Sequence, residues 1–238
     1  MNIAARPSLI VLTGAGISAE SGLGTFRDED GIWTKYPLED LATPEGFARN
    51  PDFVHGFYND RRRQLKTAKH HAGHAALARL QSAWEAQGGQ FLLVTQNVDN
   101  LHEQAGSSGV VHMHGELNQI RCMACDRQAE WHDDIDRSTR CAACGRAGDL
   151  RPHVVWFGEM PLDMDLIADA LVACDIFVAI GTSGQVYPAA GFVAEALAAG
   201  ALTVELNLEP SDNAYVFQDG RYGPASEIVP AWVDDFLS

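Results

Sequence analysis

Short apolar runs recur along the chain, and we interpret them as buried strands. They occupy residues 9–12, 91–94, 154–157, 176–180 and 202–206. Helical patterns lie between the later runs, at 162–173 and 187–199, and an earlier helix with an apolar stripe is expected to end at Gly88-Gly89. Strands that alternate with helices in this way predict an α/β fold whose parallel sheet is covered on both faces.

Two stretches interrupt this alternation. Residues 35–75 predict short helices, in which Thr43 and Asn50 are N-caps and Pro44 and Pro51 stand in the first turns. Residues 116–149 are polar, contain cysteines and show little periodicity. We interpret both stretches as insertions that together form a small second lobe.

Four cysteines in the second insertion have the spacing of a zinc site. Cys122, Cys125, Cys141 and Cys144 stand as C-x2-C-x15-C-x2-C. Two such pairs predict one tetrahedral zinc with a closed ligand shell. A closed shell leaves no position for water or substrate, so this zinc is expected to be structural. The alternative is that these are ordinary reduced thiols, as is expected of the fifth cysteine, Cys174, in the core.

Composition narrows the classes of partner. The chain has 238 residues, of which 46% are hydrophobic, enough for one large domain with an inserted module. Its net charge of −15 argues against direct nucleic-acid binding and favours basic partners, such as lysine-bearing segments of other proteins. Neither a signal peptide nor a stretch of the ~20 apolar residues of a membrane span is recognised. We therefore expect a cytoplasmic protein without membrane association.

The first apolar run leads into a glycine-rich turn. Residues 14–19 read GAGISA, which fits the dinucleotide pattern G-x-G-x-x-A. In that pattern Gly14 permits the tight turn, Gly16 lets the backbone approach a pyrophosphate, and a helix N-terminus faces the negative charge. A strand-to-helix turn without a ligand explains the letters equally well. The usual acidic residue ~20 positions later is missing; residues 22–27 instead predict a loop that covers a ligand.

Polar residues follow three further strands. Asn97 and Asp99 come after the second run, Gly181-Thr182-Ser183 after the fourth and Asn207 after the fifth. Carboxyl ends of parallel strands meet at one edge, where ligands bind. Asn97 and Asp99 are suited to hold a carboxamide or a developing cation, although a capped helix start is the alternative. Four converging strand ends predict a cofactor site.

Histidines supply candidates for a general base. His112 and His114 both precede Gly115, and in an extended segment they point the same way, so spacing does not choose between them. A structural histidine near the zinc is the alternative. His70, His71 and His74 predict a solvated helix start rather than a metal site.

Taken together, the motifs resemble the sirtuin family, and its bacterial class III (CobB-type) branch in particular. They follow the family's order from about residue 9 onward: GAGISAESG, TFR, DGIW, TQNVDNLH, HMHGEL, the paired CxxC, VVWFGEMP, GTSGQVYPAAG, ELNLEP and GPASEIVP. The resemblance implies a Rossmann-like NAD-binding domain of residues 1–34, 76–115 and 150–238. It also implies a smaller lobe, made of the helical insertion 35–75 and the zinc-ribbon module 116–149.

The implied activity is that of an NAD-dependent protein-lysine deacylase, acting as both deacetylase and desuccinylase. NAD and an acyl-lysine segment of another protein would meet between the lobes, giving nicotinamide, O-acyl-ADP-ribose and free lysine. A monomer is expected. The alternatives are a mono-ADP-ribosyltransferase, which would leave ADP-ribose on protein, and a non-catalytic NAD-sensing or zinc-ribbon interaction module.

Site residues are carried over by matching positions. The catalytic base corresponds to His114. Contacts to NAD correspond to Gly14, Ala15, Gly16, Glu20, Thr25, Phe26, Arg27, Trp33, Gln96, Asn97, Asp99, Gly181, Thr182, Ser183, Asn207, Glu209 and Ala225. One departure is Gly24, where many members carry proline, and it implies a more mobile cofactor loop.

The acyl-lysine substrate corresponds to two further sets of positions. Val155 and Phe157 lie in 155–158, which with 184–186 would clamp the peptide by β-augmentation. Tyr58 and Arg61 stand at i and i+3 and match the class III pair that grips an acidic acyl chain. From spacing alone, a solvated basic helix face explains this pair, because Arg62 and Arg63 follow.

Overall fold

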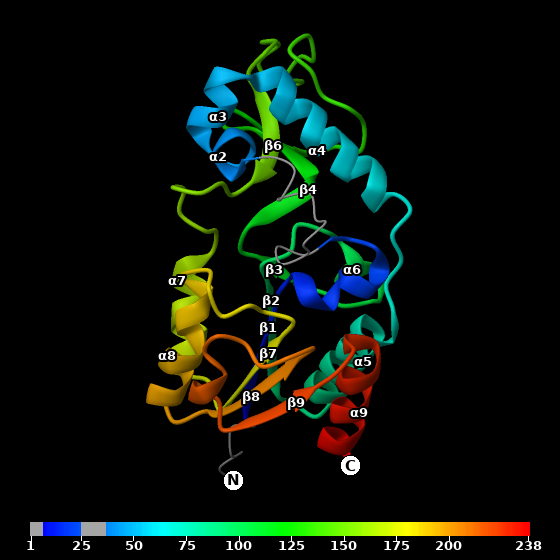
Figure 1. Ribbon diagram of the computed structural model, residues 1–238, viewed down its shortest axis with the longest axis vertical. Helices are drawn as coiled ribbons and strands as arrows, with labels where there is room; N and C mark the ends of the chain where they lie inside the picture. The colour runs from blue at the N-terminus through cyan, green and yellow to red at the C-terminus, as the bar shows by residue number, and fades with distance from the viewer. Residues whose placement is uncertain (1–6, 25–36) are drawn as a thin grey trace.

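Six parallel strands form the sheet of the larger lobe (Figure 1). The structure is a computed structural model that describes residues 7–24 and 37–238, so the predicted NAD contacts Thr25, Phe26, Arg27 and Trp33 lie outside the described residues. The strands are β1 (Ser8–Thr13), β2 (Gln90–Thr95), β3 (Val111–His112), β7 (Ile176–Ile180), β8 (Leu202–Asn207) and β9 (Asp219–Tyr222).

Strand order identifies the topology. The order is β3-β2-β1-β7-β8-β9, and each neighbouring pair is parallel. Counted within this sheet, it is the doubly wound order 3-2-1-4-5-6, whose switch point lies between its first and fourth strands. The predicted Rossmann-like sheet is therefore confirmed, with the switch point between β1 and β7.

Helices cover both faces of this sheet. Leu9 and Val11 of β1 belong to a core shared with α5 (Ala72–Ala86) and α9 (Ala225–Leu237). Ile10 and Leu12 point the other way, into a core shared with α7 (Met164–Val172) and α8 (Phe192–Ala198). Burial on both faces explains why β1 is a continuous apolar run rather than an alternating one.

The smaller lobe contains a three-stranded antiparallel sheet in the order β5-β4-β6. Its strands are β4 (Gly115–Cys122), β5 (Gln128–Glu130) and β6 (Leu150–Val154). The strand expected at 154–157 in the parallel sheet is therefore wrong, because the strand here ends at Val154 and belongs to the small sheet. The apolar run has another cause: Val154 and Trp156 are buried in the core of the small lobe, whereas Phe157 is exposed.

Three helices pack on the small sheet, at the upper end of Figure 1. They are α2 (Leu38–Leu41), α3 (Pro44–Arg49) and α4 (Pro51–Leu65). The predicted caps are confirmed: the Thr43 side chain accepts from the Gly46 N–H, and the Asn50 side chain from the Phe53 N–H. The longest described helices, α4 and α5, have 15 residues each. No described helix has the length and apolar character that crossing a bilayer requires.

Two local expectations differ from the structure. The loop after β1 enters two short 3-10 turns, η1 (Ala15–Ile17) and η2 (Ala19–Ser21), instead of the expected helix. The expected helix at 187–199 begins as the 3-10 turn η3 (Ala189–Gly191) before α8. The sequence pattern marks where the turning segment begins but does not distinguish a 3-10 turn from an α-helix.

The histidine cluster at the start of α5 is solvated at His70, as expected, but not at His71 and His74. His71 caps the helix by accepting from the Gly73 N–H at 3.0 Å, and its Nε2 donates to the Ile17 carbonyl at 2.6 Å. His74 is fully buried, and burial lowers the pKa of its imidazole to about 2. Because α5 begins beneath the loop after β1, this end of the helix faces protein rather than solvent.

Candidate functional site

A cleft of about 750 Å³ opens at the carboxyl edge of the parallel sheet, between the two lobes. Its volume lies within the ~300–1,000 Å³ of small-molecule sites. We call the side formed by the ends of β1, β2, β7 and β8 the sheet wall, and the side formed by α4 and residues 154–158 the lobe wall. The described residues predicted for catalysis, NAD or substrate all line this cleft: Gly14, Ala15, Gly16, Glu20, Tyr58, Arg61, Gln96, Asn97, Asp99, His114, Val155, Phe157, Gly181, Thr182, Ser183, Asn207, Glu209 and Ala225.

The glycine loop is held against the end of β7. Gly14 N–H donates to the Ile180 carbonyl and Gly16 N–H to the Gly181 carbonyl, each at 2.9 Å. A Cβ on Gly14 would lie 2.7 Å from the Gly181 oxygen, and one on Gly16 would lie 2.7 Å from the Gly181 Cα. The two glycines are thus required by the close approach of two protein backbones at the switch point, a reason that the fingerprint alone does not reveal.

Asn97 and Asp99 form a buried polar network with Ser18. Asn97 Nδ2 donates to the Gly14 carbonyl and to Ser18 Oγ, both at 3.1 Å, and Ser18 Oγ donates to Asp99 Oδ2 at 3.0 Å. Burial raises the pKa of Asp99, while hydrogen bonds from Leu101 and Ser18 oppose this rise. The arrangement fixes Asn97 and Asp99 at the floor of the cleft.

Sequence reasoning missed Ser18, since it occupies an unspecified position of the fingerprint and meets Asp99 only after folding. The alternative interpretation of Asp99, as the cap of a helix start, is also partly right. Its Oδ1 accepts at 3.1 Å from the N–H of Leu101, where α6 (Leu101–Gln104) begins. Asp99 therefore supports a helix start and lines the cleft at once.

The Gln96 carbonyl next to His114 determines which of the two ring nitrogens carries the proton. Its Nδ1 lies 3.0 Å from the Gln96 carbonyl oxygen, which only accepts, so Nδ1 carries the proton and Nε2 is the basic nitrogen. Burial lowers the pKa of this imidazole, and the Gln96 contact opposes that effect. A neutral imidazole with a basic Nε2 is the state that a general base needs near neutral pH.

His112 and Gly115 flank this histidine in different ways. Both ring nitrogens of His112 already face oxygens, Nδ1 the Asn97 carbonyl at 3.2 Å and Nε2 Glu103 Oε1 at 2.8 Å. Gly115 has a φ of +75°, and a Cβ there would lie 2.1 Å from the His153 oxygen. The geometry therefore favours His114 as the base and explains why glycine follows it.

The lobe wall carries the Tyr58–Arg61 pair. Tyr58 is buried, and its hydroxyl oxygen accepts from Trp156 Nε1 at 2.9 Å, which leaves its own proton to donate. Burial raises the pKa of Tyr58 to about 12, so the hydroxyl stays protonated. Arg61 lines the cleft with its guanidinium 5.9 Å from the Phe57 ring centre, and within the described ranges it has no ion pair.

Three consecutive arginines of α4 have three different surroundings. Arg61 lines the cleft, whereas Arg62 is buried and donates to the Leu117 carbonyl at 2.9 Å. Arg63 is exposed and pairs with Asp60 and Asp134. The solvated basic face that spacing suggested thus describes Arg63 but not Arg61.

Some predicted NAD contacts also hold the loops of the sheet wall together. Asn207 Nδ2 donates to the Thr182 carbonyl at 2.7 Å. Glu20 Oε1 accepts from the Ser226 N–H at 3.0 Å, which ties the loop after β1 to the first turn of α9. Their carboxylate and amide groups therefore shape the cleft as well as lining it.

The four cysteine sulfurs lie within 4.8 Å of one another, away from the cleft. Two of the separations, Cys122–Cys144 and Cys125–Cys141, are 3.8 Å. A tetrahedral zinc with Zn–S bonds of ~2.3 Å requires sulfurs ~3.8 Å apart, whereas a disulfide requires ~2.05 Å. The thiols therefore fit a closed zinc site that makes no contact with the cleft.

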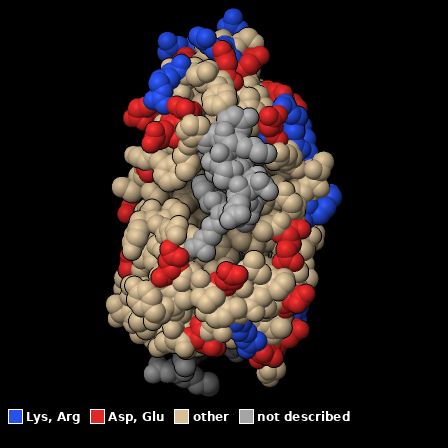
Figure 2. Space-filling model, in the orientation of Figure 1, with Lys and Arg blue, Asp and Glu red and all other residues tan. Residues whose placement is uncertain are grey.

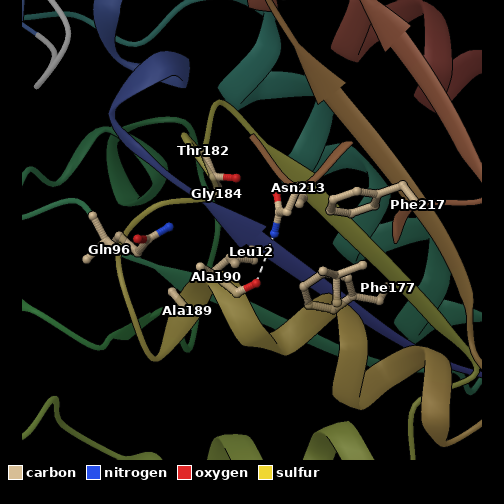
Figure 3. A pocket seen from close by; sticks show the side chains of 12 residues that line it. Leu12, Gln96, Phe177, Thr182, Gly184, Ala189, Ala190, Asn213 and Phe217 are labelled. Atoms are coloured by element: carbon tan, nitrogen blue, oxygen red, sulfur yellow. Dashed lines mark hydrogen bonds between the residues drawn. The ribbon is translucent and has the colours of Figure 1, made fainter. Parts of the chain in front are cut away.

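A second, much smaller cavity of about 10 Å³ lies beside the sheet wall and shares Gln96 and Thr182 with it (Figure 3). Its other side includes Phe177 and Asn213, and Asn213 Nδ2 donates to the Ala190 carbonyl at 2.9 Å. A single water needs ~10–15 Å³, so this space has no room for a cofactor.

Comparison with known proteins agrees with this architecture. Residues 14–188 match the Sir2 family. A Caulobacter vibrioides protein named NAD-dependent protein deacylase is 61% identical over 232 residues, which is 97% of each chain. An Escherichia coli K12 protein of the same name is 56% identical over 98% of this chain and 83% of its own. The crystal structure of a Sir2 homologue in complex with NAD superposes with a TM-score of 0.86 at 36% identity, covering 97% of this chain and 91% of that one. With this match in sequence and in fold, the chain belongs to the Sir2 family.

Proposed function

We propose that this protein is an NAD-dependent protein-lysine deacylase that removes both acetyl and succinyl groups. The observation that carries the proposal is one cleft shared by three groups: the basic Nε2 side of His114, the Asn97–Ser18–Asp99 network and the Tyr58–Arg61 pair. The relatives named NAD-dependent protein deacylase support the same activity.

Each of these groups has a separate task. When bound, NAD supplies an ADP-ribosyl group that accepts the acyl oxygen as nicotinamide leaves, so it is consumed. Asn97 and Asp99 hold the nicotinamide carboxamide, and the glycine loop with residues 181–183 and Asn207 binds the remainder. His114 takes a ribose hydroxyl proton at Nε2. One water molecule is consumed to release the lysine, and the products are nicotinamide, O-acyl-ADP-ribose and free lysine.

Acyl selectivity is assigned to the lobe wall. Arg61 presents a planar fork that suits a terminal carboxylate, and Tyr58 adds a neutral hydroxyl donor. A charge-assisted hydrogen bond contributes ~1.5–3 kcal/mol and a neutral one ~0.5–1.5 kcal/mol. We therefore expect a ~30- to 1000-fold preference for succinyl-lysine over an uncharged acyl group of equal length. Acetyl-lysine is too short to reach Arg61 and reacts through the shared part of the site.

The partners are acyl-lysine segments of other proteins, clamped by Val155 and Phe157 and the 184–186 segment. The net charge is −15, and Figure 2 shows acidic side chains over both lobes of the face viewed, with basic ones gathered mainly at the end occupied by the small lobe. Such a surface favours substrates with basic flanks. We also propose one structural zinc on the four cysteines, the domain division given by the sequence, a monomer and a cytoplasmic location.

A product assay tests the proposal. The protein is incubated with NAD and matched peptides carrying acetyl-, succinyl- or uncharged C4-acyl-lysine, and the products are identified by mass spectrometry. Free lysine and O-acyl-ADP-ribose from both the acetyl and succinyl peptides are expected. ADP-ribose attached to protein would instead support a mono-ADP-ribosyltransferase, and unconsumed NAD would support a non-catalytic role.

A further inference from the structure

Two histidine–glutamate pairs have the same contact distance but opposite surroundings. His112 Nε2 lies 2.8 Å from Glu103 Oε1, and His132 Nε2 lies 2.8 Å from Glu130 Oε1. The side chain of His112 is 8% exposed and that of Glu103 39%, whereas His132 is 55% exposed and Glu130 71%. Of the two pairs, that of His112 adjoins the cleft residues, because His112 Nδ1 also lies 3.2 Å from the Asn97 carbonyl oxygen. The proposed deacylation gives His112 no task, although it is held at both ends.

Both partners of His112 are acceptors. A carboxylate and a backbone carbonyl have no proton to offer, and a neutral imidazole has only one N–H. In the neutral form, one of the two contacts would set a nitrogen lone pair against an oxygen. The imidazolium donates to both, so the geometry selects the charged ring.

The surrounding charges act in the same direction. Burial lowers the pKa of His112, but the hydrogen bond and charge of Glu103, the charge of Glu116 and the Asn97 contact raise it above its ordinary value. The pKa of Glu103 is lowered overall, because burial raises it less than the hydrogen bond from His112 and the positive charge of that ring together lower it. The buried imidazolium is thus paired with a carboxylate that still contacts solvent, so that only one of the two charges loses most of its hydration on folding.

This cation lies against the turn that carries Asn97 and Asp99. The titratable groups that interact with it are Glu103 and His102 of α6, Glu116 of β4 and Asp99 itself. Burial lowers the pKa of His102 to about 4, so that ring is neutral, with Nε2 3.0 Å from Thr13 Oγ1. Burial raises the pKa of Asp99, whereas the positive charge of His112 lowers it. The imidazolium therefore favours the carboxylate form of a buried acid.

We propose that His112 is a positioning residue that acts as a buried imidazolium, gripping Glu103 and the Asn97 carbonyl so that the turn stays in place with Asp99 ionised. The inference rests on the proposed role of Asn97 and Asp99 in holding the carboxamide of nicotinamide. His112 itself makes no contact with the reacting atoms in this scheme. It acts on the reaction through the geometry and charge of the turn.

The sign of the pH dependence follows from the two histidines. Activity should rise with pH as His114 loses its proton, below the ordinary imidazole pKa, because burial lowers the pKa of His114. It should fall again as His112 loses its proton, above the ordinary value, because Glu103 raises the pKa of His112. The wild-type protein is thus expected to have a bell-shaped profile in kcat.

Three variants test this assignment. His112→Gln should lower kcat near pH 7 by about tenfold or more, the value of the charge-assisted hydrogen bond that it removes from the turn, and should remove the alkaline limb that titration of His112 produces. Glu103→Gln should move that limb to lower pH. Each of these two variants is expected to change kcat and the KM for NAD, while the KM for the peptide stays unchanged. His132→Gln, the matched exposed pair, should leave the profile as in wild type.

Nitrogen-15 NMR of histidine-labelled protein gives a readout that does not depend on turnover. In wild type, both nitrogens of His112 should be protonated at pH 7, and Glu103→Gln should lower the pH at which one is lost. A neutral His112 ring at pH 7, or wild-type pH profiles in both His112→Gln and Glu103→Gln, would overturn the proposal. If thermal denaturation shows that His112→Gln does not fold, the pH profile of Glu103→Gln and the NMR of the wild type decide whether the proposal holds. A wild-type protein without deacylase activity would refute the proposed function, while the NMR would still test the ring.

Discussion

The sheet wall of the cleft is hydrogen-bonded to itself, whereas the lobe wall leaves its polar groups available. Ser18, Asn97 and Asp99 are all buried and joined by hydrogen bonds of 3.0–3.1 Å. On the lobe wall, Tyr58 has its own proton to donate, and Arg61 has no ion pair within the described part of α4 and its surroundings. A prearranged wall suits steps common to every substrate, and an unpaired guanidinium suits discrimination between substrates.

The two walls also differ in what supports them. The sheet wall stands on two apolar cores, one on each face of the parallel sheet. The lobe wall stands on one separate core, which includes Val54 and Trp156, and the zinc module behind it adds only a small cluster of Ile120, Ile135 and Leu150 with two of the cysteines. We therefore expect damage to the sheet wall to affect all substrates equally, and changes in the lobe wall to alter their ratio.

Loss of the base should have the largest effect. His114→Ala is expected to reduce deacetylation and desuccinylation alike by ~10²–10⁴-fold or more, because it removes a general base. NAD binding and the melting temperature should stay near wild type, since His114 lies at the cleft surface. Steady-state kinetics on both peptides and calorimetric NAD titration measure this. The assignment is wrong if a His112 substitution proves more damaging than the His114 one.

Arg61→Met should lower the ratio of desuccinylation to deacetylation. Desuccinylation is expected to fall by ~10- to 150-fold, the value of a charge-assisted hydrogen bond, while deacetylation stays within about twofold. Arg63→Met is the matched control, because Arg63 lies two residues further along α4 and pairs only with exposed acids. Competition assays with mixed peptides measure the ratio. Equal loss of both activities in Arg61→Met would show that Arg61 supports the fold or NAD instead.

A smaller change in the same direction is expected from Tyr58→Phe. Removing one neutral hydroxyl donor costs ~0.5–1.5 kcal/mol, so desuccinylation should fall about 2- to 10-fold. The same substitution leaves the buried Trp156 N–H without its acceptor, so a modest drop in melting temperature should accompany it. Deacetylation per folded molecule should change little. A fall in deacetylation equal to that in desuccinylation would argue against a role for the hydroxyl in selectivity.

Disrupting the zinc module is expected to have the smallest effect on the ratio of desuccinylation to deacetylation. Cys141→Ser, or treatment with a chelator, should lower the melting temperature and the zinc content, with both activities falling together as the lobe unfolds. Cys174→Ser is the control, because Cys174 lies outside the four-cysteine cluster. Loss of activity on chelation without any unfolding would contradict a structural role for the metal.

Sequence patterns predicted much of this molecule because they reflect local rules. Helix caps at Thr43 and Asn50 and the paired cysteines depend on residues close together in the chain, and the structure confirms the caps and brings the four sulfurs together. The order of motifs predicted the family, which the Sir2 match confirms. The roles of individual site residues remain predictions, although all the described residues that were predicted for catalysis, NAD or substrate line the same cleft.

The errors occur where identical local patterns can meet different surroundings. An apolar run predicts burial but not its partner, so residues 154–157 were assigned to the wrong sheet. A polar residue at a helix start predicts solvent unless another segment covers it, as the loop after β1 contacts His71 and the ring of His102 packs on His74. The same limit applies to spacing alone at arginines 61–63, because consecutive side chains lie ~100° apart around α4 and so meet three different surroundings.

By itself, the sequence determined the α/β class, the caps, the metal spacing and the set of residues that meet at one sheet edge. Periodicity and spacing act over a few residues, and they suffice for these features. The tertiary structure alone decided which nitrogen of His114 is basic, that Arg62 is buried while Arg63 is exposed, and that Ser18 joins Asn97 to Asp99. These depend on contacts between segments tens of residues apart, and a hydrogen bond or a buried charge exists only once both partners have been brought together.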